Sequence, residues 1–590
     1  MKLKILFTGL VISLIACQPQ ENVGPASKLL TPFEKGNGNQ SPSYEEGMRF
    51  WYELAQKSPH VAMEEYGNTD ANLPLHLMIW SADGSFSSEQ AEEKNKHIVF
   101  INNAIHPGEP DGVDATMLLF RDLSANDSLK EKFKDIVLVA IPYYNIGGAL
   151  QRNTSFRANQ NGPEEYGFRG NAKNYDLNRD FIKMDSDNMW AFARYFHKWN
   201  PLVFIDNHVS NGADYQYVVT YLSCQEDKLG EVMGPYQRDK LNPLMEEKMT
   251  EKNHLISPYV NVFGRQPEKG GIVQFFDSPR YASGFGGLFQ SFSYTVETHM
   301  LKPYKDRVLG TYDFMLSLCE IIRENGNEME EIKENQQTVW LEVDSIPLQW
   351  KLDSQRVDSL NFHGYHSEYI PSELTGAPRL KYHQDQAKTF EIPFYNRYQA
   401  SLYRPKPKAY LIPQAWKEIM DRMKRNGVKS WSRLEKDSLI QVNAIKVKNF
   451  ETLTRPFEGH YLHYNTEVEY SPEKYQARKG DFLVELESDR DFFIMSVLEP
   501  EAIDSYFNWN FFDTYLQQKE GYSSYVFEDK ALEILAQDPE LKSRFEEKKD
   551  TDPSFASNPA WQLYWVYTQS EHYEDNHMRL PVFRIEKDLN

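Results

Sequence analysis

Cysteine is almost absent from this sequence, with three residues among 590. So few thiols exclude a fold held together by a disulfide framework. An excess of positive charge is missing too, because 65 Lys and Arg stand against 86 Asp and Glu, a formal net charge of −21. Since this surplus of negative charge opposes extended contact with a phosphate backbone, we expect no nucleic-acid partner.

The sequence also lacks an apolar run long enough to span a membrane as a helix. Its N-terminal apolar stretch, Ile5–Ala16, is too short for that and follows two lysines, as in a secretory signal. The next residue, Cys17, ends the stretch "LIAC", which resembles the lipobox of bacterial lipoproteins. We therefore expect a signal peptide over 1–17, acylation of Cys17, a polar tether over 18–45, and a lipid-anchored protein of the bacterial cell envelope, at the outer membrane. The alternative is an ordinary cleaved signal with a chance cysteine.

The two other cysteines are Cys224 and Cys319. Cys319 lies in the apolar helical run "TYDFMLSLCEIIREN", where a buried thiol is the usual outcome. Whether the two thiols pair is left open by the sequence.

Apolar residues make up 40% of the chain, which is ample for a core, and the length predicts at least two domains. Four brief, nearly continuous apolar runs predict strands covered on both faces, and three segments with helical spacing lie between and after them. The last of these helices ends, by its pattern, at Gly326 as a C-cap. We predict an α/β domain over 46–330 with a mostly parallel mixed sheet flanked by helices, its strands at 97–105, 135–145, 201–209 and 291–299 and its helices at 111–123, 186–199 and 305–326.

The character of the sequence changes after this domain. A charged connector, "ENGNEMEEIKENQQ", leads into a region of alternating residues, then a strand, a helix with Gly427 as its cap, and further half-buried strands. We predict a second domain over 335–590, mixed α and β or β-rich, whose role the pattern does not reveal.

The stretch "INNAIHPGEPDG" places His106 three residues before Glu109, where a predicted buried strand gives way to a loop. Open α/β sheets bind ligands at this edge. The pair by itself is equally consistent with a solvated turn.

A second predicted strand, "FIDNHV", carries His208 near its end with Asp206 two residues earlier. Two histidines and a carboxylate at adjacent strand ends are the three protein ligands of a catalytic zinc, which keeps its fourth position for water. A further strand, "SFSYTVETH", carries Glu297, which could take a proton from such a water.

A polar segment, "FRGNAKNYDLNRDF", holds Arg169, Arg179, Asn178 and Asp176. Guanidinium groups bind carboxylates in a bidentate fork and stabilise a developing oxyanion.

Together, H-P-G-E, D-x-N-R, D-x-H and a strand ending in Glu resemble, in this order, the zinc carboxypeptidases of family M14, the carboxypeptidase A-like peptidases. The resemblance covers about 46–326 and implies a zinc carboxypeptidase-like fold and one zinc ion. It also implies the following roles: His106, Glu109 and His208 as zinc ligands, Glu297 as general base and proton shuttle, Asn178 and Arg179 as the holders of the substrate's C-terminal carboxylate, Asp176 as the residue that orients His106, Arg169 with Arg157 as alternative for the oxyanion, and Tyr281 as the mobile residue that caps the substrate.

The sequence departs from the family in reading "NRDF", with Asp180 where Asn is commoner, and H-E-x-x-H is absent, which excludes the helical zincin arrangement. We expect a lipid-anchored zinc metallocarboxypeptidase that acts on peptides. Two alternatives stay open: an amidohydrolase for peptidoglycan stem peptides (muropeptides) or acylated amino acids, and an inactive surface-binding lipoprotein. His460 and His463 could suggest a second metal, but we interpret them as alternating exposed residues of a strand.

Overall fold

The computed structural model describes residues 26–587, so the expected signal peptide and Cys17 lie outside the described residues. The first domain is built on an eight-stranded sheet in the order β1-β2-β4-β3-β5-β9-β6-β7. Strands β4, β3, β5 and β9 are parallel at its centre, and β2 and β6 pair antiparallel with β4 and β9 at the two sides. Beyond them, β1 pairs antiparallel with β2 and β7 pairs parallel with β6. The strands are β1 Val61–Asn68, β2 Pro74–Ser81, β3 His97–Asn102, β4 Ile136–Ile141, β5 Val203–Ser210, β6 Val219–Ser223, β7 Ile256–Pro258 and β9 Phe292–His299.

The four predicted strands are confirmed as β3, β4, β5 and β9, and every residue of β3, β4 and β5 is buried. Their continuous β-branched and apolar sequence fits strands that are covered on both faces. The chain leaves the sheet earlier than predicted after β3, because Ala104 adopts a positive φ of 53°. The helices that flank this sheet are α2 Tyr44–Lys57, α4 Asp111–Ala125, α7 Asp187–Trp199, α9 Asn242–Glu251, α11 Ala282–Leu288 and α12 Tyr304–Glu342.

Helix α12 corrects one prediction. It continues 16 residues beyond Gly326, so Gly326 is no C-cap, the charged connector is helical, and the predicted boundary at 330–335 falls inside a helix. Gly326 serves close packing, since a Cβ there would lie 2.5 Å from the His97 ring. The helix continues because Met329, Lys333, Gln336 and Trp340 form a buried stripe at helical spacing.

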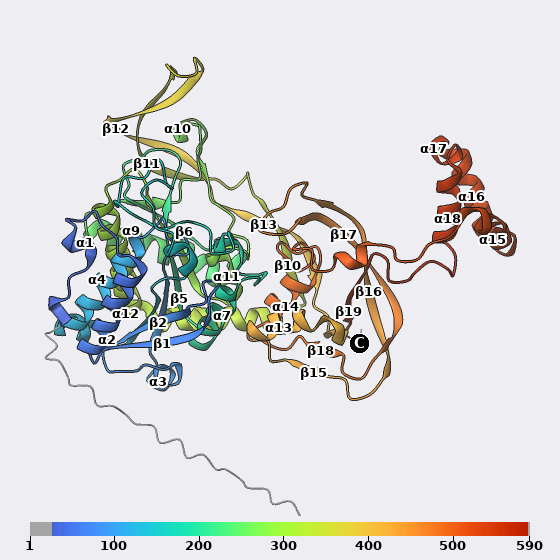
Figure 1. Ribbon diagram of the computed structural model, residues 1–590, viewed down its shortest axis with the longest axis horizontal. Coiled ribbons are helices and arrows are strands. Elements are labelled where there is room, and N and C mark those ends of the chain that lie inside the picture. Colours follow the sequence, from blue (N-terminus) through green and yellow to red (C-terminus); the bar gives the residue numbers. More distant parts are fainter. Residues whose placement is uncertain (1–25, 588–590) are drawn as a thin grey trace, which may run out of the picture.

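The second domain is largely β. Its main sheet has six strands in the order β15-β18-β14-β19-β16-β17, and a separate pair joins β10 to β13. A long hairpin of β11 and β12 stands on the first domain rather than on this sheet (Figure 1). Its strand β12 pairs with β8, Ile272–Val273, of the first domain. The strands are β10 Ser345–Leu352, β11 Asp358–Pro371, β12 Pro378–Tyr395, β13 Tyr398–Pro405, β14 Ala409–Ile412, β15 Trp431–Arg433, β16 Ser438–Thr452, β17 His463–Ala477, β18 Phe482–Glu485 and β19 Arg579–Ile585, and the helices are α13 Lys417–Arg425, α14 Asp491–Leu498, α15 Ser524–Gln537, α16 Pro539–Thr551, α17 Pro553–Ala556 and α18 Pro559–Thr568.

The two domains share one hydrophobic core. One cluster of buried residues runs from Phe100 and Phe196 of the first domain to Phe493 and Val497 of α14. The opposite face of the first sheet packs against α4 and α12 in a second cluster. Helices α15 to α18 stand apart with a small core of their own (Figure 1).

Cys224 and Cys319 are both buried free thiols, so they do not pair. Within residues 26–587, no helix has both the length and the apolar character needed to cross a bilayer.

Candidate active site

The candidate site lies at the carboxyl ends of the central parallel strands. The loop after β3 carries His106 and Glu109 and leads directly into α4. On the neighbouring strands, His208 of β5 and Glu297 of β9 are register partners. The parallel pairing therefore places side chains that are about 190 positions apart in the sequence at one edge of the sheet.

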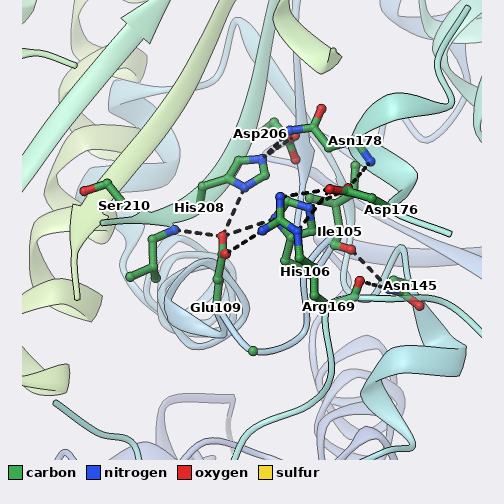
Figure 2. A network of polar contacts seen from close by, with 12 residues as sticks. Ile105, His106, Glu109, Asn145, Arg169, Asp176, Asn178, Asp206, His208 and Ser210 are labelled. Carbon is green, nitrogen blue, oxygen red and sulfur yellow. Dashed lines mark hydrogen bonds and ion pairs between the residues drawn. The ribbon is translucent and has the colours of Figure 1, made fainter. Parts of the chain in front are cut away.

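His106, Glu109 and His208 form a compact buried cluster, in which one potential ligand atom from each residue lies within 4.8 Å of the other two. The Nδ1 atoms of His106 and His208 lie 3.4 and 3.1 Å from Glu109 Oε2 (Figure 2). Two imidazole nitrogens and one carboxylate are a donor set that suits zinc, with room for a fourth ligand. The residues present thus fit the metal that the sequence predicts.

The ring nitrogens that point away from the cluster are held by two aspartates. His106 Nε2 lies 2.8 Å from Asp176 Oδ1, as predicted for Asp176, and His208 Nε2 lies 2.7 Å from Asp206 Oδ2. The second aspartate is supported by Asn102, whose side-chain amide donates to Asp206 Oδ1 at 2.9 Å. These contacts fix which nitrogen of each ring faces Glu109.

Asp206 and Asn102 are not among the site residues predicted from the sequence. The signal for Asp206 is its spacing, because residues two apart on a strand point to the same face. Nothing in the sequence points to Asn102, which becomes the register partner of Asp206 only when β3 and β5 pair.

The charged groups of the site shift one another's pKa values. Burial alone would raise the pKa of Glu109, but Arg157 and His106 hold it well below its usual value. Burial likewise opposes the charged form of His208, yet Asp206 and Glu109 hold its pKa well above the usual value. At Glu297 burial prevails and raises the pKa to about 7. A carboxyl group with this pKa can exchange a proton near neutral pH.

Both arginines considered for the oxyanion lie at Glu109. Arg157 Nη1 is 2.7 Å from Glu109 Oε1, and Arg169 Nη1 is 3.4 Å from the same atom. Arg169 also reaches Asp176 Oδ2 through Nε at 3.0 Å and Nη2 at 2.9 Å. The side chain of Arg169 is 45% exposed and that of Arg157 is 16% exposed, so Arg169 is the more accessible of the two.

The donor cluster and Glu297 line a cavity with a volume of about 540 Å³. Asn178, Arg179 and Tyr281 line the same cavity. The guanidinium of Arg179 stacks over the ring of Tyr281 at 4.5 Å. The side-chain oxygen of Asn178 accepts the backbone N–H of Ala282 at 3.0 Å, which ties the two loops together. The structure therefore places all three predicted substrate-binding residues beside the donor cluster.

Asp180, the departure from the family pattern, is buried and does not line this cavity. Its carboxylate accepts the Lys183 ammonium at 2.9 Å and the backbone N–H groups of Asp185 and Ser186 at 2.8 and 3.0 Å. It organises the turn before α7, so the departure is a local structural feature.

The two histidines of the second domain form no joint metal site. His460 contacts Asp185 and Asn510, whereas His463 contacts Thr452 and Asp513. Their interpretation as alternating exposed residues of a strand is wrong, because His463 is buried at the start of β17 and His460 lies in a turn before it. Across residues 26–587, no other three His, Cys, Asp or Glu side chains converge as the donor cluster does.

Comparison with known proteins points to one family. The sequence model of peptidase family M14, described as zinc carboxypeptidase, matches residues 48–209. Carboxypeptidase 2 of Trichophyton rubrum is 23% identical over 493 residues, which cover 80% of this chain and 84% of that protein, and the protein of the same name from Trichophyton equinum gives the same values. Among solved structures, a metallo-carboxypeptidase from Burkholderia cenocepacia is 18% identical, covers 48% of this chain and 70% of that one, and has a TM-score of 0.36. The matched segment contains the donor cluster and ends before Glu297.

Proposed function

We propose that the protein is a zinc-dependent carboxypeptidase that hydrolyses the last peptide bond of its substrate, since residues 48–209 match the model of the M14 zinc carboxypeptidase family. One observation carries the proposal: His106, Glu109 and His208 converge on one point beside Glu297 and a group of arginines.

In this proposal, His106, Glu109 and His208 hold zinc, which when bound polarises the scissile carbonyl and acidifies a water molecule. Glu297 accepts a proton from the attacking water as its oxygen bonds to the carbonyl carbon. The same carboxyl then delivers the proton to the amine nitrogen as the C–N bond breaks. Arg169 stabilises the negative charge that develops on the carbonyl oxygen.

The remaining residues of the cavity recognise the end of the substrate. Arg179 and Asn178 would bind the terminal carboxylate through a guanidinium fork and an amide N–H. Tyr281 would cover the bound residue and exclude water from it. This arrangement requires a free carboxylate at the end of the substrate.

The decisive substitution is Glu297→Gln. We expect kcat to fall by about 10²- to 10⁴-fold, because an amide cannot accept the proton, while zinc content and thermal stability stay unchanged. Glu246→Gln is the matched control, since its carboxyl also has a pKa raised by burial but lies outside the cavity. Full, chelator-sensitive hydrolysis by the Glu297→Gln variant would show that the assigned base is wrong.

A substrate panel tests the reaction class. We expect release of the C-terminal residue from peptides with a free carboxylate and none from the same peptides with a C-terminal amide. Muropeptides belong in the panel, because their preferential hydrolysis would favour the amidohydrolase alternative. A protein that holds no zinc and cleaves nothing in the panel would favour the inactive binding protein.

The cellular location is a separate proposal that rests on the sequence of the N-terminus. We propose a lipid anchor at Cys17 in the bacterial outer membrane. Cys17→Ser should move the protein from the detergent-soluble membrane fraction to the aqueous fraction, as measured by immunoblotting of fractionated cells. Retention of the variant in the membrane would contradict the anchor.

A further inference from the structure

Two loops of the candidate site are pressed against the second domain. The first, residues 168–185, we term the DLNR loop, and the second, residues 277–282, the Tyr281 loop. The turn of residues 457–460 between β16 and β17 contacts both loops, and the segment after α14, residues 499–512, contacts the Tyr281 loop. Helices α13 and α14 lie beside α7 and α11 along the same interface (Figure 1).

Glu458 connects the second domain to the donor cluster. It stands at the tip of a tight two-residue turn, where φ is 50° at Glu458 and 83° at Gly459. Backbone hydrogen bonds between Phe457 and His460 close this turn. A positive φ is unfavourable for glutamate and persists only where the surroundings enforce it. From this tip, Glu458 Oε2 accepts the backbone N–H of Asp176 at 2.8 Å.

The same Asp176 accepts from His106 and from Arg169 through its side chain. A contact from the second domain is therefore one residue removed from a predicted zinc ligand. The turn is also seated against the DLNR loop by packing, because a Cβ at Gly459 would lie only 3.0 Å from the Tyr175 ring.

Asp504 makes the second connection. It is buried, it also has a positive φ, of 67°, and its carboxylate binds Arg280 of the Tyr281 loop. The Arg280 backbone N–H donates to Oδ2 at 3.0 Å, and Nε donates to Oδ1 at 2.7 Å. The guanidinium also packs over the Trp509 ring at 4.9 Å.

Arg280 is the direct neighbour of Tyr281, whose ring stacks against Arg179. Fixing the backbone of Arg280 therefore fixes the position of Tyr281 and, through the stacked side chains, of Arg179. Loops that carry binding residues are otherwise the more mobile parts of a fold, and catalytic geometry tolerates little displacement.

We propose that the second domain is a positioning part of the active site, in which Glu458 holds Asp176 and thereby His106, and Asp504 holds Arg280 and thereby Tyr281 and Arg179. This inference rests on the proposed function and gives the second domain a role in it. Glu458 and Asp504 are positioning residues, since neither lines the cavity that would receive the substrate.

Asp504→Asn in the full-length protein tests the hold on the Tyr281 loop. We expect KM for a peptide with a free carboxylate to rise at least tenfold with a smaller change in kcat, because the terminal carboxylate loses its prearranged partners. Discrimination between free-acid and amidated peptides should fall in parallel, a readout that general destabilisation would not move. Arg280→Gln should have the same effect, and the double variant should be no worse than either single one.

Glu458→Ala tests the hold on the DLNR loop. We expect zinc to bind up to about tenfold more weakly, the lower end of what loss of an outer partner of a ligand costs. Competition with a chelator measures the zinc affinity and does not depend on an activity assay. The matched control is Arg425→Gln, which removes another contact between the domains, to the Tyr66 hydroxyl at 3.3 Å, away from both loops. Zinc affinity and KM should be unchanged in this control.

The outcomes separate the two proposals. If the wild-type protein hydrolyses no peptide, the proposed function fails, and zinc affinity still decides the role of Glu458. If the wild type is active and Asp504→Asn and Glu458→Ala behave like Arg425→Gln, the positioning role is wrong. Should Asp504→Asn fail to fold, Arg280→Lys decides in its place, because it keeps the charge and removes the planar two-point contact.

Discussion

At the scale of single residues, the site depends on how the two imidazole rings are oriented. Each ring is held by an aspartate on one nitrogen and turns the other nitrogen toward Glu109. The two aspartates come from different parts of the chain: Asp206 shares a strand with its histidine, and Asp176 belongs to the DLNR loop. A ligand histidine that lost its partner could rotate or bind in the wrong tautomer.

We predict that Asp206→Asn weakens zinc binding by about 10- to 100-fold, because the amide can turn its N–H₂ toward His208 Nε2 and so favour the tautomer with the proton on the nitrogen that faces Glu109. The protein should stay folded. Chelator competition gives the zinc dissociation constant, and circular dichroism checks the fold. Asp214→Asn is the control, since Asp214 is a buried carboxylate outside the cavity. Equal zinc affinity in the two variants would contradict the role of Asp206.

At the scale of elements, the site requires α4 to begin close to β5. Gly112, in the first turn of α4, makes this approach possible, because a Cβ there would lie 2.3 Å from the Asn207 side chain. The loop before the helix can then place Glu109 against His208. Helix α7 plays a different part, because its last turn lies at the interface with α13, where His197 Nε2 faces Asn426 Oδ1 at 3.1 Å.

This position of His197 predicts a dependence of stability on pH. Burial, and then the charge of Arg490, lower the pKa of His197 from 6.5 to about 3. The folded protein therefore keeps this ring neutral, whereas the unfolded chain binds a proton below pH 6.5. Above pH 6.5 the ring is neutral in both states, whereas below pH 6.5 proton binding by the unfolded chain lowers the free energy of unfolding. This loss continues as the pH falls toward about 3 and reaches about 3 kcal/mol at about pH 4.5.

Denaturant unfolding at pH 7 and at about pH 4.5 measures the effect. His197→Gln should lose less stability between the two pH values than the wild type, because the amide keeps a polar contact to Asn426 and does not titrate. His572→Gln, at an exposed position, should behave as the wild type does. An unchanged pH dependence in His197→Gln would contradict the assignment.

At the scale of the whole molecule, the two domains form one unit and the helices α15 to α18 form another. The hydrophobic core crosses from the first domain into the second, whereas the four helices pack only on their own cluster. The chain leaves for these helices and returns at one point, where Glu574 accepts the backbone N–H of Glu520 at 3.1 Å. Because the two domains bury apolar surface in one shared core, we expect them to unfold as one cooperative unit.

We predict that replacing 521–572 by a short Gly-Ser linker leaves the main melting temperature within about 2 °C of the wild type, because no buried side chain of the main core is removed. Hydrolysis of short peptides should be unchanged. Differential scanning calorimetry should show a single main transition in both proteins. Two well-separated transitions in the shortened protein would contradict the shared core.

Much of the site follows from local sequence patterns. Continuous apolar runs predict the four central strands, and His106, Glu109, His208 and Glu297 come together because such strands end at one edge of the sheet. The other elements escape such patterns where a distant contact overrides a local signal. Gly326 is a helix-ending residue by sequence, but the His97 ring and the buried stripe beyond it keep α12 intact.

The sequence by itself determined the donor residues and the strands that carry them, because these signals lie within a few consecutive positions. Only the tertiary structure decided that Asn102 supports Asp206, that both Arg157 and Arg169 reach Glu109, and that Glu458 and Asp504 contact the loops of the site. Most of these contacts join residues more than a hundred positions apart. Their existence depends on how strands and domains pack together, which no local pattern encodes.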